Sequence, residues 1–292
     1  MTTKRITKDK GHSLLLIALI YAAAFGSGAA VLAAAAPLMH PLWALFAADT
    51  AATVMVFMSN LICKNASVYD PYWSVQPVLL ITAMFWQYGA AFHPVQLLTL
   101  IPLACWSLRL TLNWMSGFDN LDWEDWRYRD LKRRAPCPCL VIFLGVMMMP
   151  TCLVFLGCIP LWYLLHAETP GPVLPAAGGL FILLGTALEH VADSQMRSYR
   201  RNPNRSPCID EGLWRYSRHP NYCGEILVWV GVFIAALSNF SLLSCAGVVL
   251  IMLLFTVVSI PMMEKHLLEK RPEYARYRKM VSPLIPWKRK TG

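Results

Sequence analysis

The chain has 292 residues, of which 57% are hydrophobic and only 15% are charged. Soluble domains carry about 25% charged and about 45–50% apolar residues, so the composition excludes an ordinary soluble enzyme. The net charge of +9 would suggest nucleic acid as a partner if the basic residues covered a soluble face. The basic residues lie instead in segments between apolar runs, which excludes nucleic acid as the partner.

Apolar segments long enough to cross a bilayer recur along the chain. We expect eight helical spans, at about residues 13–37, 42–63, 73–92, 95–115, 138–166, 174–196, 223–238 and 241–263. The seventh is short and could be re-entrant or merge with the eighth, so seven spans are the alternative. The first span follows a basic head (Lys4, Arg5, Lys8 and Lys10) but is too long for the apolar part of a signal peptide, and we interpret it as a retained helix.

The basic residues lie in alternate loops of this arrangement. They occupy the head, Lys64, the segments 116–137 and 197–222, and the tail from Lys265, whereas the loops near His40, His93, Glu168 and Asn239 hold none. Because cytoplasmic loops collect Lys and Arg, both termini are expected in the cytoplasm. The sequence therefore predicts an all-α, polytopic integral membrane bundle of seven to eight transmembrane helices, forming one membrane domain over residues 1–292.

The nine cysteines are scattered, most of them inside predicted spans. They show neither the spacing of zinc ligands nor a disulfide framework, so no metal is expected. No GxGxxG run follows a strand, which excludes a soluble dinucleotide-binding fold.

The most informative span is the sixth, because it ends in a polar stripe. Glu189, Asp193, Arg197 and Arg200 recur at spacings of four, four and three, so they share one helix face. One interpretation is a pair of salt bridges four residues apart along this helix. The other is an anion site in which guanidinium groups clamp phosphates. By contrast, Asp49 is alone in an Ala-rich span, which favours a hydrogen bond between helices over a site.

The loop after this span leads into the seventh. Pro220 suits the first turn of a helix, so the seventh span is expected to begin at 219–221, with its positive dipole end toward the loop. Such an end attracts anions. Asn221 and Glu225 are four residues apart and therefore face one side of this helix.

Two further segments contain polar and aromatic residues together. Residues 65–73 offer the Asp70 carboxylate and two phenols, which could bind a substrate oxygen or form an aromatic interfacial belt with a turn before Pro71. The loop 122–128 permits the same two interpretations. The tail 264–277 is predicted to be a cytoplasmic helix broken at Pro272, with charges that face solvent or lipid headgroups.

The run GLWRYSRHPNYCGE at 212–225, the upstream EHVADSQMR at 189–197 and the tail motifs over 264–287 resemble the steroid 5-alpha-reductase superfamily. The likeness is to its bacterial membrane branch. It is strong over residues 185–287 and extends to 65–73 and 125–128.

This resemblance implies a membrane oxidoreductase that takes NADPH from the cytoplasmic side, in a bacterial inner membrane. It would reduce the carbon–carbon double bond of a lipophilic enone such as a 3-oxo-Δ4 steroid. Residues 174–287 would be the reductase-like core with the cofactor loops, and spans within 1–137 would contribute to the substrate cavity. The partners implied are the lipophilic substrate and membrane lipid, with no obligate protein partner.

The resemblance also assigns residues. The cofactor would be bound by Asp193, Arg197, Arg200, Arg215, Arg218, His219, Asn221, Tyr222, Glu225, His266, Tyr274 and Tyr277. Tyr72, supported by Asp70, is suggested as the donor to the substrate carbonyl, with Glu225 as a third catalytic residue. Arg109 and Trp73 would contact the substrate.

Two alternatives remain open. Arg218-His219-Pro220 also resembles delta-14 sterol reductases and isoprenylcysteine methyltransferases, and the methyltransferases use S-adenosylmethionine. Asn221, Glu225 and the paired arginines favour the reductases. The other alternative is a non-enzymatic protein that binds sterol or lipid.

Overall fold

The computed structural model describes residues 9–90, 92–168 and 170–289. These residues fold as helices and turns, without a named strand, as the sequence predicts. The basic head residues Lys4, Arg5 and Lys8 lie outside the described residues.

The protein is a helical membrane bundle. Six helices in the described ranges are long and apolar enough to cross a bilayer: Lys10–Ala35, Pro41–Cys63, Pro94–Gly117, Pro138–Leu165, Val173–Arg201 and Leu242–Lys270. The third and seventh expected spans are also helical, but they form the shorter helices α3 (Tyr72–Tyr88) and α9 (Pro220–Ala235). The 16 residues of α9 extend about 24 Å, against about 30 Å of bilayer hydrocarbon.

The chain divides into two compact units. Unit 1 comprises residues 1–92 and 110–158, and unit 2 comprises residues 93–109 and 159–292. Helix α4 (Leu97–Gly117) and helix α7 (Met149–Leu165) each contribute one part to each unit.

Unit 1 is built on a close pair of helices, α1 (Lys10–Ala35) and α2 (Pro41–Cys63). A Cβ built on Gly28 of α1 would lie 3.0 Å from the Ala48 carbonyl oxygen of α2, so small residues let the two backbones approach. The other elements of this unit are η1 (Ala66–Tyr69), α3, α5 (Trp126–Arg134), α6 (Pro138–Val141) and the π-helical turn η3 (Ile142–Met148), which continues into α7.

Unit 2 contains the polar segments singled out above. Its elements are η2 (Pro94–Gln96), α8 (Val173–Arg201), η4 (Gly212–Arg215), α9, η5 (Leu237–Asn239), α10 (Leu242–Leu253), the π-helical turn η6 (Leu254–Ser259), α11 (Ile260–Lys270) and α12 (Tyr274–Met280). Helix α9 begins at Pro220, and the tail helix breaks around Pro272; both predictions are confirmed.

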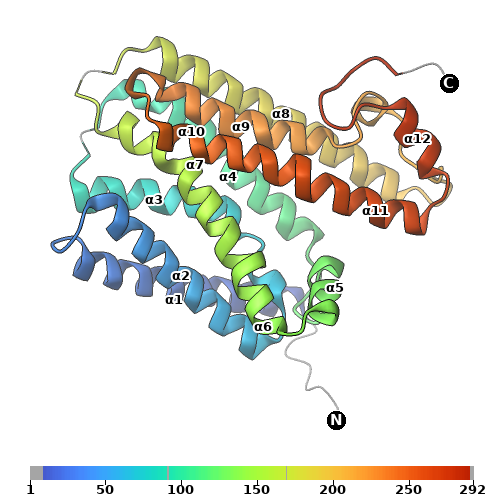
Figure 1. Cartoon of the computed structure of the whole chain (residues 1–292), viewed down its shortest axis with the longest axis horizontal. Helices are drawn as coiled ribbons and strands as arrows, with labels where there is room; N and C mark the ends of the chain where they lie inside the picture. The colour runs from blue at the N-terminus through green and yellow to red at the C-terminus, as the bar shows by residue number, and fades with distance from the viewer. Residues whose placement is uncertain (1–8, 91, 169, 290–292) are drawn as a thin grey trace. The chain divides into compact units, whose positions relative to one another are not determined.

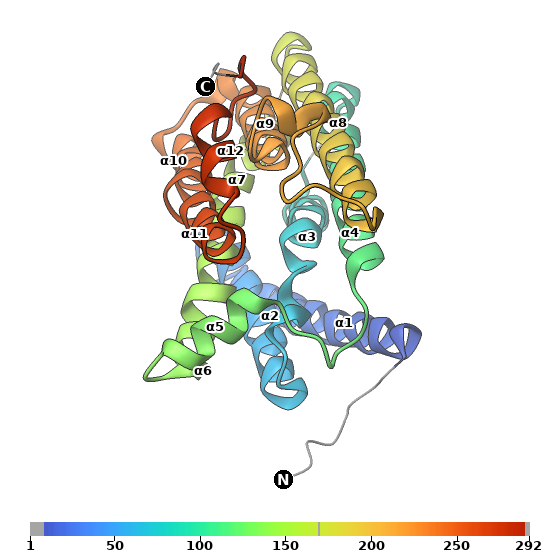
Figure 2. The ribbon, with the colours of Figure 1, turned by 90° about the vertical axis from the view of Figure 1, so that its right-hand side faces the viewer.

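Helices α8 and α9 run side by side (Figures 1 and 2). Two glycine pairs bring their backbones together. A Cβ on Gly178 would lie 2.5 Å from the Gly231 carbonyl oxygen, and a Cβ on Gly185 would lie 2.5 Å from that of Gly224. Because each helix carries its two glycines seven residues apart, the contact follows one face of both helices in antiparallel orientation. This close approach positions the polar end of α8 beside the first turns of α9.

Candidate functional site

Arg109 of α4 joins two acidic residues of α8. Its guanidinium group donates to Asp193 Oδ2 at 2.8 Å and also hydrogen-bonds and ion-pairs with Glu189. The side chains are 13% exposed for Arg109 and 3% for Glu189, so this charge cluster is inside the bundle. Salt bridges along α8 were one of the two interpretations of this stripe; in the structure Glu189 and Asp193 both pair with an arginine of another helix, Arg109.

This arrangement gives Arg109 and Asp193 a partner in the protein itself, and the roles predicted for them stay predictions. Arg109 was expected to contact the substrate, and Asp193 the cofactor. In the structure the two bind each other, because a buried charge is costly unless it is paired. The ion pair between them therefore joins α4 to α8 in the protein without a ligand.

The Glu225 carboxylate points into unit 2. Its Oε1 accepts a hydrogen bond from Trp229 Nε1 at 3.0 Å, and its Oε2 accepts one from Trp106 Nε1 at 3.4 Å. The two indole rings meet edge to face, with centroids 5.6 Å apart. Both carboxylate oxygens are therefore held by indole N–H groups.

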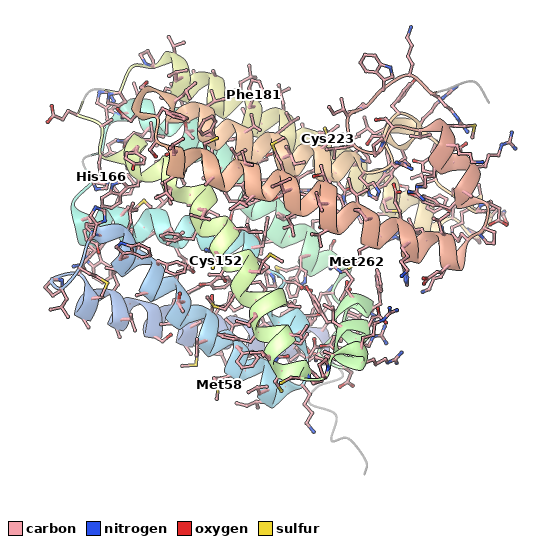
Figure 3. The ribbon with its side chains drawn as sticks, in the orientation of Figure 1. Met58, Cys152, His166, Phe181, Cys223 and Met262 are labelled. Atoms are coloured by element: carbon pink, nitrogen blue, oxygen red, sulfur yellow. The ribbon has the colours of Figure 1, made fainter. Side chains whose placement is uncertain are left out.

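Most of the predicted phosphate-binding arginines lie at the same end of α8 and α9. Arg197 is half-buried and donates to Ser194 Oγ at 3.1 Å, whereas Arg200 and Arg215 are exposed. Asn221 is half-buried on the first turn of α9, two residues before Cys223, which is labelled in Figure 3. These side chains present cations and a carboxamide at one end of unit 2.

Two hydrogen bonds join the loop before α9 to α8. The Leu213 backbone N–H donates to Gln195 Oε1 at 2.9 Å, and Trp214 Nε1 donates to the Ala192 carbonyl oxygen at 3.1 Å. Gly212 has a φ of +56°, and a Cβ there would meet the Gln195 side chain at 2.3 Å. The left-handed backbone favours glycine at this position, and a larger residue would have to displace the Gln195 side chain.

Arg218 and His219 do not point to an open site, because both pair with Glu264 of α11. Arg218 Nε lies 3.2 Å and His219 Nε2 lies 3.4 Å from Glu264 Oε1, and Arg278 Nε of α12 lies 2.8 Å from Oε2. Glu264 was not predicted as a site residue. Together with Arg278 it lines a cavity of about 460 Å³, whose other lining residues are Pro261, Lys265, Leu268 and Glu269.

The aromatic residues predicted to bind the cofactor differ in their surroundings. The Tyr277 hydroxyl donates to the Trp214 carbonyl oxygen at 2.5 Å. This hydrogen bond joins α12 to η4. The buried Tyr274 hydroxyl has no hydrogen-bond partner in the described part of the chain. Burial raises the pKa of both phenols, which are neutral at physiological pH. Tyr222 stacks on His219, with ring centroids 5.2 Å apart, and His266 is half-buried on α11.

In unit 1, the residue that supports Tyr72 is Asp49, not Asp70. Tyr72 of α3 donates to Asp49 Oδ1 of α2 at 2.7 Å, and Gln76 Nε2 donates to Asp49 Oδ2 at 2.5 Å. Asp49 therefore joins two helices, as predicted. This pairing could not be predicted, because the two residues are 23 positions apart and belong to different helices.

Asp70 binds a different phenol, that of Tyr128. The Tyr128 hydroxyl donates to Asp70 Oδ1 at 2.5 Å. Burial raises the pKa of Asp70 to about 6, although the hydrogen bond from Tyr128 acts in the opposite direction. Trp73 is half-buried on the first turn of α3.

Sequence reasoning missed a set of hydrogen bonds around Thr151 of α7. Thr151 Oγ1 lies 2.8 Å from Thr53 Oγ1 and 2.7 Å from the Tyr69 hydroxyl, and its carbonyl oxygen accepts from Gln76 Nε2 at 3.0 Å. These residues are far apart in the sequence, so only the fold identifies their partners. Of the predicted site residues, Asp70, Tyr72 and Trp73 belong to unit 1 and all the others to unit 2.

Comparisons with known proteins give one match. A family model with the description protein of unknown function (DUF1295) matches residues 56–281 of the 292. No curated protein and no solved structure matches the chain.

Proposed function

The chain belongs to the DUF1295 family of proteins of unknown function, and we propose that it is a membrane-embedded reductase that uses NADPH to reduce the carbon–carbon double bond of a lipophilic enone. A 3-oxo-Δ4 steroid represents this class of substrate. The observation that supports the proposal most strongly is the set of cations and polar groups at the adjoining ends of α8 and α9, next to a buried charge cluster.

The side chains at this end have the chemistry that NADPH requires. Arg200 and Arg215 are exposed and make no ion pair within the described residues, so both can bind phosphate oxygens in the bidentate geometry of guanidinium groups. Arg197, which donates to Ser194 Oγ, lies one turn earlier on α8. The N-terminus of α9, which begins at Pro220, adds the positive end of a helix dipole.

A carboxamide-binding pair follows on α9. The half-buried Asn221 side chain has no hydrogen-bond partner in the described ranges, and Glu225 lies one turn further into the bundle. Asn221 can both donate to and accept from the nicotinamide carboxamide, and Glu225 can accept its N–H. The arginines also favour NADPH over NADH, because the additional 2′-phosphate of NADPH needs cations.

The chemistry of enone reduction requires a proton donor at the carbonyl. When bound, NADPH would supply a hydride for the β carbon; a donor at the carbonyl oxygen would stabilise the negative charge that develops there, and the α carbon would take a proton from water to give the saturated ketone. We assign the donor role to the Tyr72 phenol, which is buried and hydrogen-bonded to Asp49. Asp49 holds the phenol in place and replaces Asp70 as its supporting carboxyl group.

The proposal includes a topology. Helices α3 and α9 would cross the membrane in addition to the six longer helices, which gives eight spans and places both termini in the cytoplasm of a bacterial cell, at its inner membrane. The alternation of basic and non-basic loops supports this orientation. The cofactor end of α8 and α9 carries many of the basic residues and would face the cytoplasm.

Ligand-dependent thermal stability of the purified protein tests the cofactor assignment. NADPH at 100 times its Kd should stabilise the fold by about 2.7 kcal/mol. This gain should disappear in the double variant Arg197→Ala/Arg200→Ala. The matched control is Arg129→Ala/Arg133→Ala, which removes two exposed arginines four residues apart on α5 and should retain the response.

The alternatives predict other responses. Stabilisation by S-adenosylmethionine without any effect of NADPH would identify a methyltransferase instead. Stabilisation by a sterol, with no NADPH effect and no NADPH oxidation, would identify a lipid-binding protein. Either result would contradict the reductase.

A further inference from the structure

The long helix Leu242–Lys270 carries its first charged residues close to the membrane boundary. It is one of the six helices that are long and apolar enough to cross a bilayer, and within it no charged residue precedes Glu264. Its uncharged part, residues 242–263, extends about 33 Å, against about 30 Å of bilayer hydrocarbon. Glu264 and Lys265 therefore lie where the headgroup layer begins, two and three residues beyond Met262, which is labelled in Figure 3.

The cavity described above lies at this depth. Its volume is about 460 Å³, and it is lined by residues of α11 and by Arg278 of α12. The lining begins at Pro261, at the hydrocarbon edge, and ends at Glu269, which is about 12 Å further along the helix. Since a headgroup layer is about 5–8 Å thick, the cavity extends through the whole layer. Its volume is in the range of small-molecule sites, about 300–1,000 Å³.

Glu264 orients a guanidinium group at the cavity. It is 4% exposed, and Arg278 Nε lies 2.8 Å from its Oε2. Its Oε1 lies 3.2 Å from Arg218 Nε, so the carboxylate interacts with two arginines. The Arg278 side chain is 51% exposed, and its Nη groups make no ion pair in the described ranges. Arg278 can therefore bind an oxyanion through these groups while Glu264 holds its Nε.

Lys265 supplies a second cation to the lining. It is exposed and has no ion-pair partner within the part of the chain that the structure describes. Together with Arg218 and Arg278 it makes three cations, against the two carboxylates of Glu264 and Glu269. Positive charge is thus in excess around the cavity, which favours an anionic ligand.

We propose that this cavity binds the phosphodiester group of a membrane phospholipid, with Lys265 and Arg278 as its cations. A phospholipid carries its phosphate in the headgroup layer, at the depth of these two side chains, and its acyl chains would leave the cavity past Pro261. Basic pockets at the ends of transmembrane helices are typical sites for lipid headgroups. The inference does not depend on the proposed reductase activity.

Photocrosslinking locates the bound lipid. The full-length protein in detergent micelles would be mixed with dioleoylphosphatidylglycerol that carries a diazirine on its headgroup, irradiated, digested and analysed by mass spectrometry. We expect an adduct within residues 261–278. Unlabelled dioleoylphosphatidylglycerol should compete for this position, whereas dioleoylglycerol, which has the same acyl chains but no phosphate, should not. Adducts that are absent from residues 261–278, or equal competition by the two lipids, would overturn the proposal.

A matched pair of lysine variants tests the role of Lys265. Lys265→Gln should weaken binding of dioleoylphosphatidylglycerol about fivefold, since one lysine near a lipid phosphate contributes an effect of this size. Lys265→Arg keeps the cation and should bind like the wild type. Lys270→Gln is the control, because Lys270 is exposed on the same helix but does not line the cavity. Unfolding temperatures establish that the variants are folded, and equal binding by Lys265→Gln and Lys270→Gln would contradict the assignment.

Two other ligands distinguish the possible sources of the anion. Inorganic phosphate shares the charge of the lipid phosphate but has no acyl chains, so it should compete far more weakly than the lipid for the adduct within residues 261–278. NADPH should not compete there. Competition by inorganic phosphate as strong as that by the lipid would identify a site for free phosphate, and competition by NADPH would make the cavity a part of the cofactor site. Either result would overturn the lipid assignment.

Discussion

The Tyr72 phenol of α3 donates a 2.7 Å hydrogen bond to the Asp49 carboxylate of α2. Both side chains are buried, and Gln76 binds the second Asp49 oxygen. The phenol is held in one position by this bond, and because it has a single O–H, donation to a substrate oxygen would require the proton to turn from Asp49 to that oxygen. This relationship gives the proposed reductase a proton donor that can be tested.

Tyr72→Phe should lower the rate of enone reduction by about 10²–10⁴-fold, since it removes a general acid. The stabilisation by NADPH should remain. NADPH oxidation in the presence of an enone measures the reduction rate, and thermal unfolding measures the stabilisation by NADPH. Tyr69→Phe is the matched control, because it removes another buried phenol hydroxyl, one bonded to Thr151. Equal rate losses in the two variants would contradict the role of Tyr72.

Arg109→Ala should destabilise the protein by about 3–5 kcal/mol, because Glu189 and Asp193 lose their buried counter-ion. Adding Glu189→Gln to this variant should recover part of the loss, since one uncompensated charge is removed. Unfolding in detergent, compared across the two single variants and the double variant, measures the coupling. Purely additive effects would argue against the ion pair.

Gly185→Ala should destabilise unit 2 by about 1–3 kcal/mol, because the new methyl group would meet the Gly224 carbonyl oxygen at 2.5 Å. The helices α8 and α9 would have to separate. Gly26→Ala in α1 is the control, since a Cβ there has nothing within 4 Å. It should be neutral or stabilise the helix by up to about 1 kcal/mol. The difference in unfolding temperature between the two variants tests the close packing.

Asp70 should make stability depend on pH. Burial raises the pKa of its carboxyl group from 3.8 to about 6 in the folded chain. As the pH rises from about 4 to 6, the unfolded chain releases this proton before the folded chain does. Stability therefore decreases over this range, by at most about 3 kcal/mol. Thermal unfolding of Asp70→Asn, which cannot titrate here, should show a smaller decrease than the wild type, and an identical pH profile would contradict the assignment.

The sequence predicted the helices well because span formation depends on local hydropathy. Each of the eight expected segments is helical, and the start of α9 at Pro220 and the break near Pro272 follow from the properties of proline. The hydropathy pattern could not determine how many helices cross the membrane, because α3 and α9 are shorter than the six helices that are long enough to span it.

The partners of the polar residues could not be predicted. The stripe from Glu189 to Arg200 was visible as a helix face, but the cation that binds its acids is Arg109, 80 residues earlier than Glu189. Glu264 lies in a charged tail that resembled a solvated surface, yet it is buried against Arg218 and His219. Such pairings depend on how helices pack, and residue spacing within one helix does not contain that information.

Hydride transfer tests the central claim most directly. NADPH carrying deuterium at the transferable C4 position would be incubated with the purified protein and a 3-oxo-Δ4 steroid, together with extracted membrane lipids as further candidate substrates, and the products would be analysed by mass spectrometry. The account predicts a saturated ketone that contains one deuterium, formed about 10²–10⁴-fold more slowly by Tyr72→Phe. Transfer of a labelled methyl group from S-adenosylmethionine to a lipid, with no deuterated product, would contradict it.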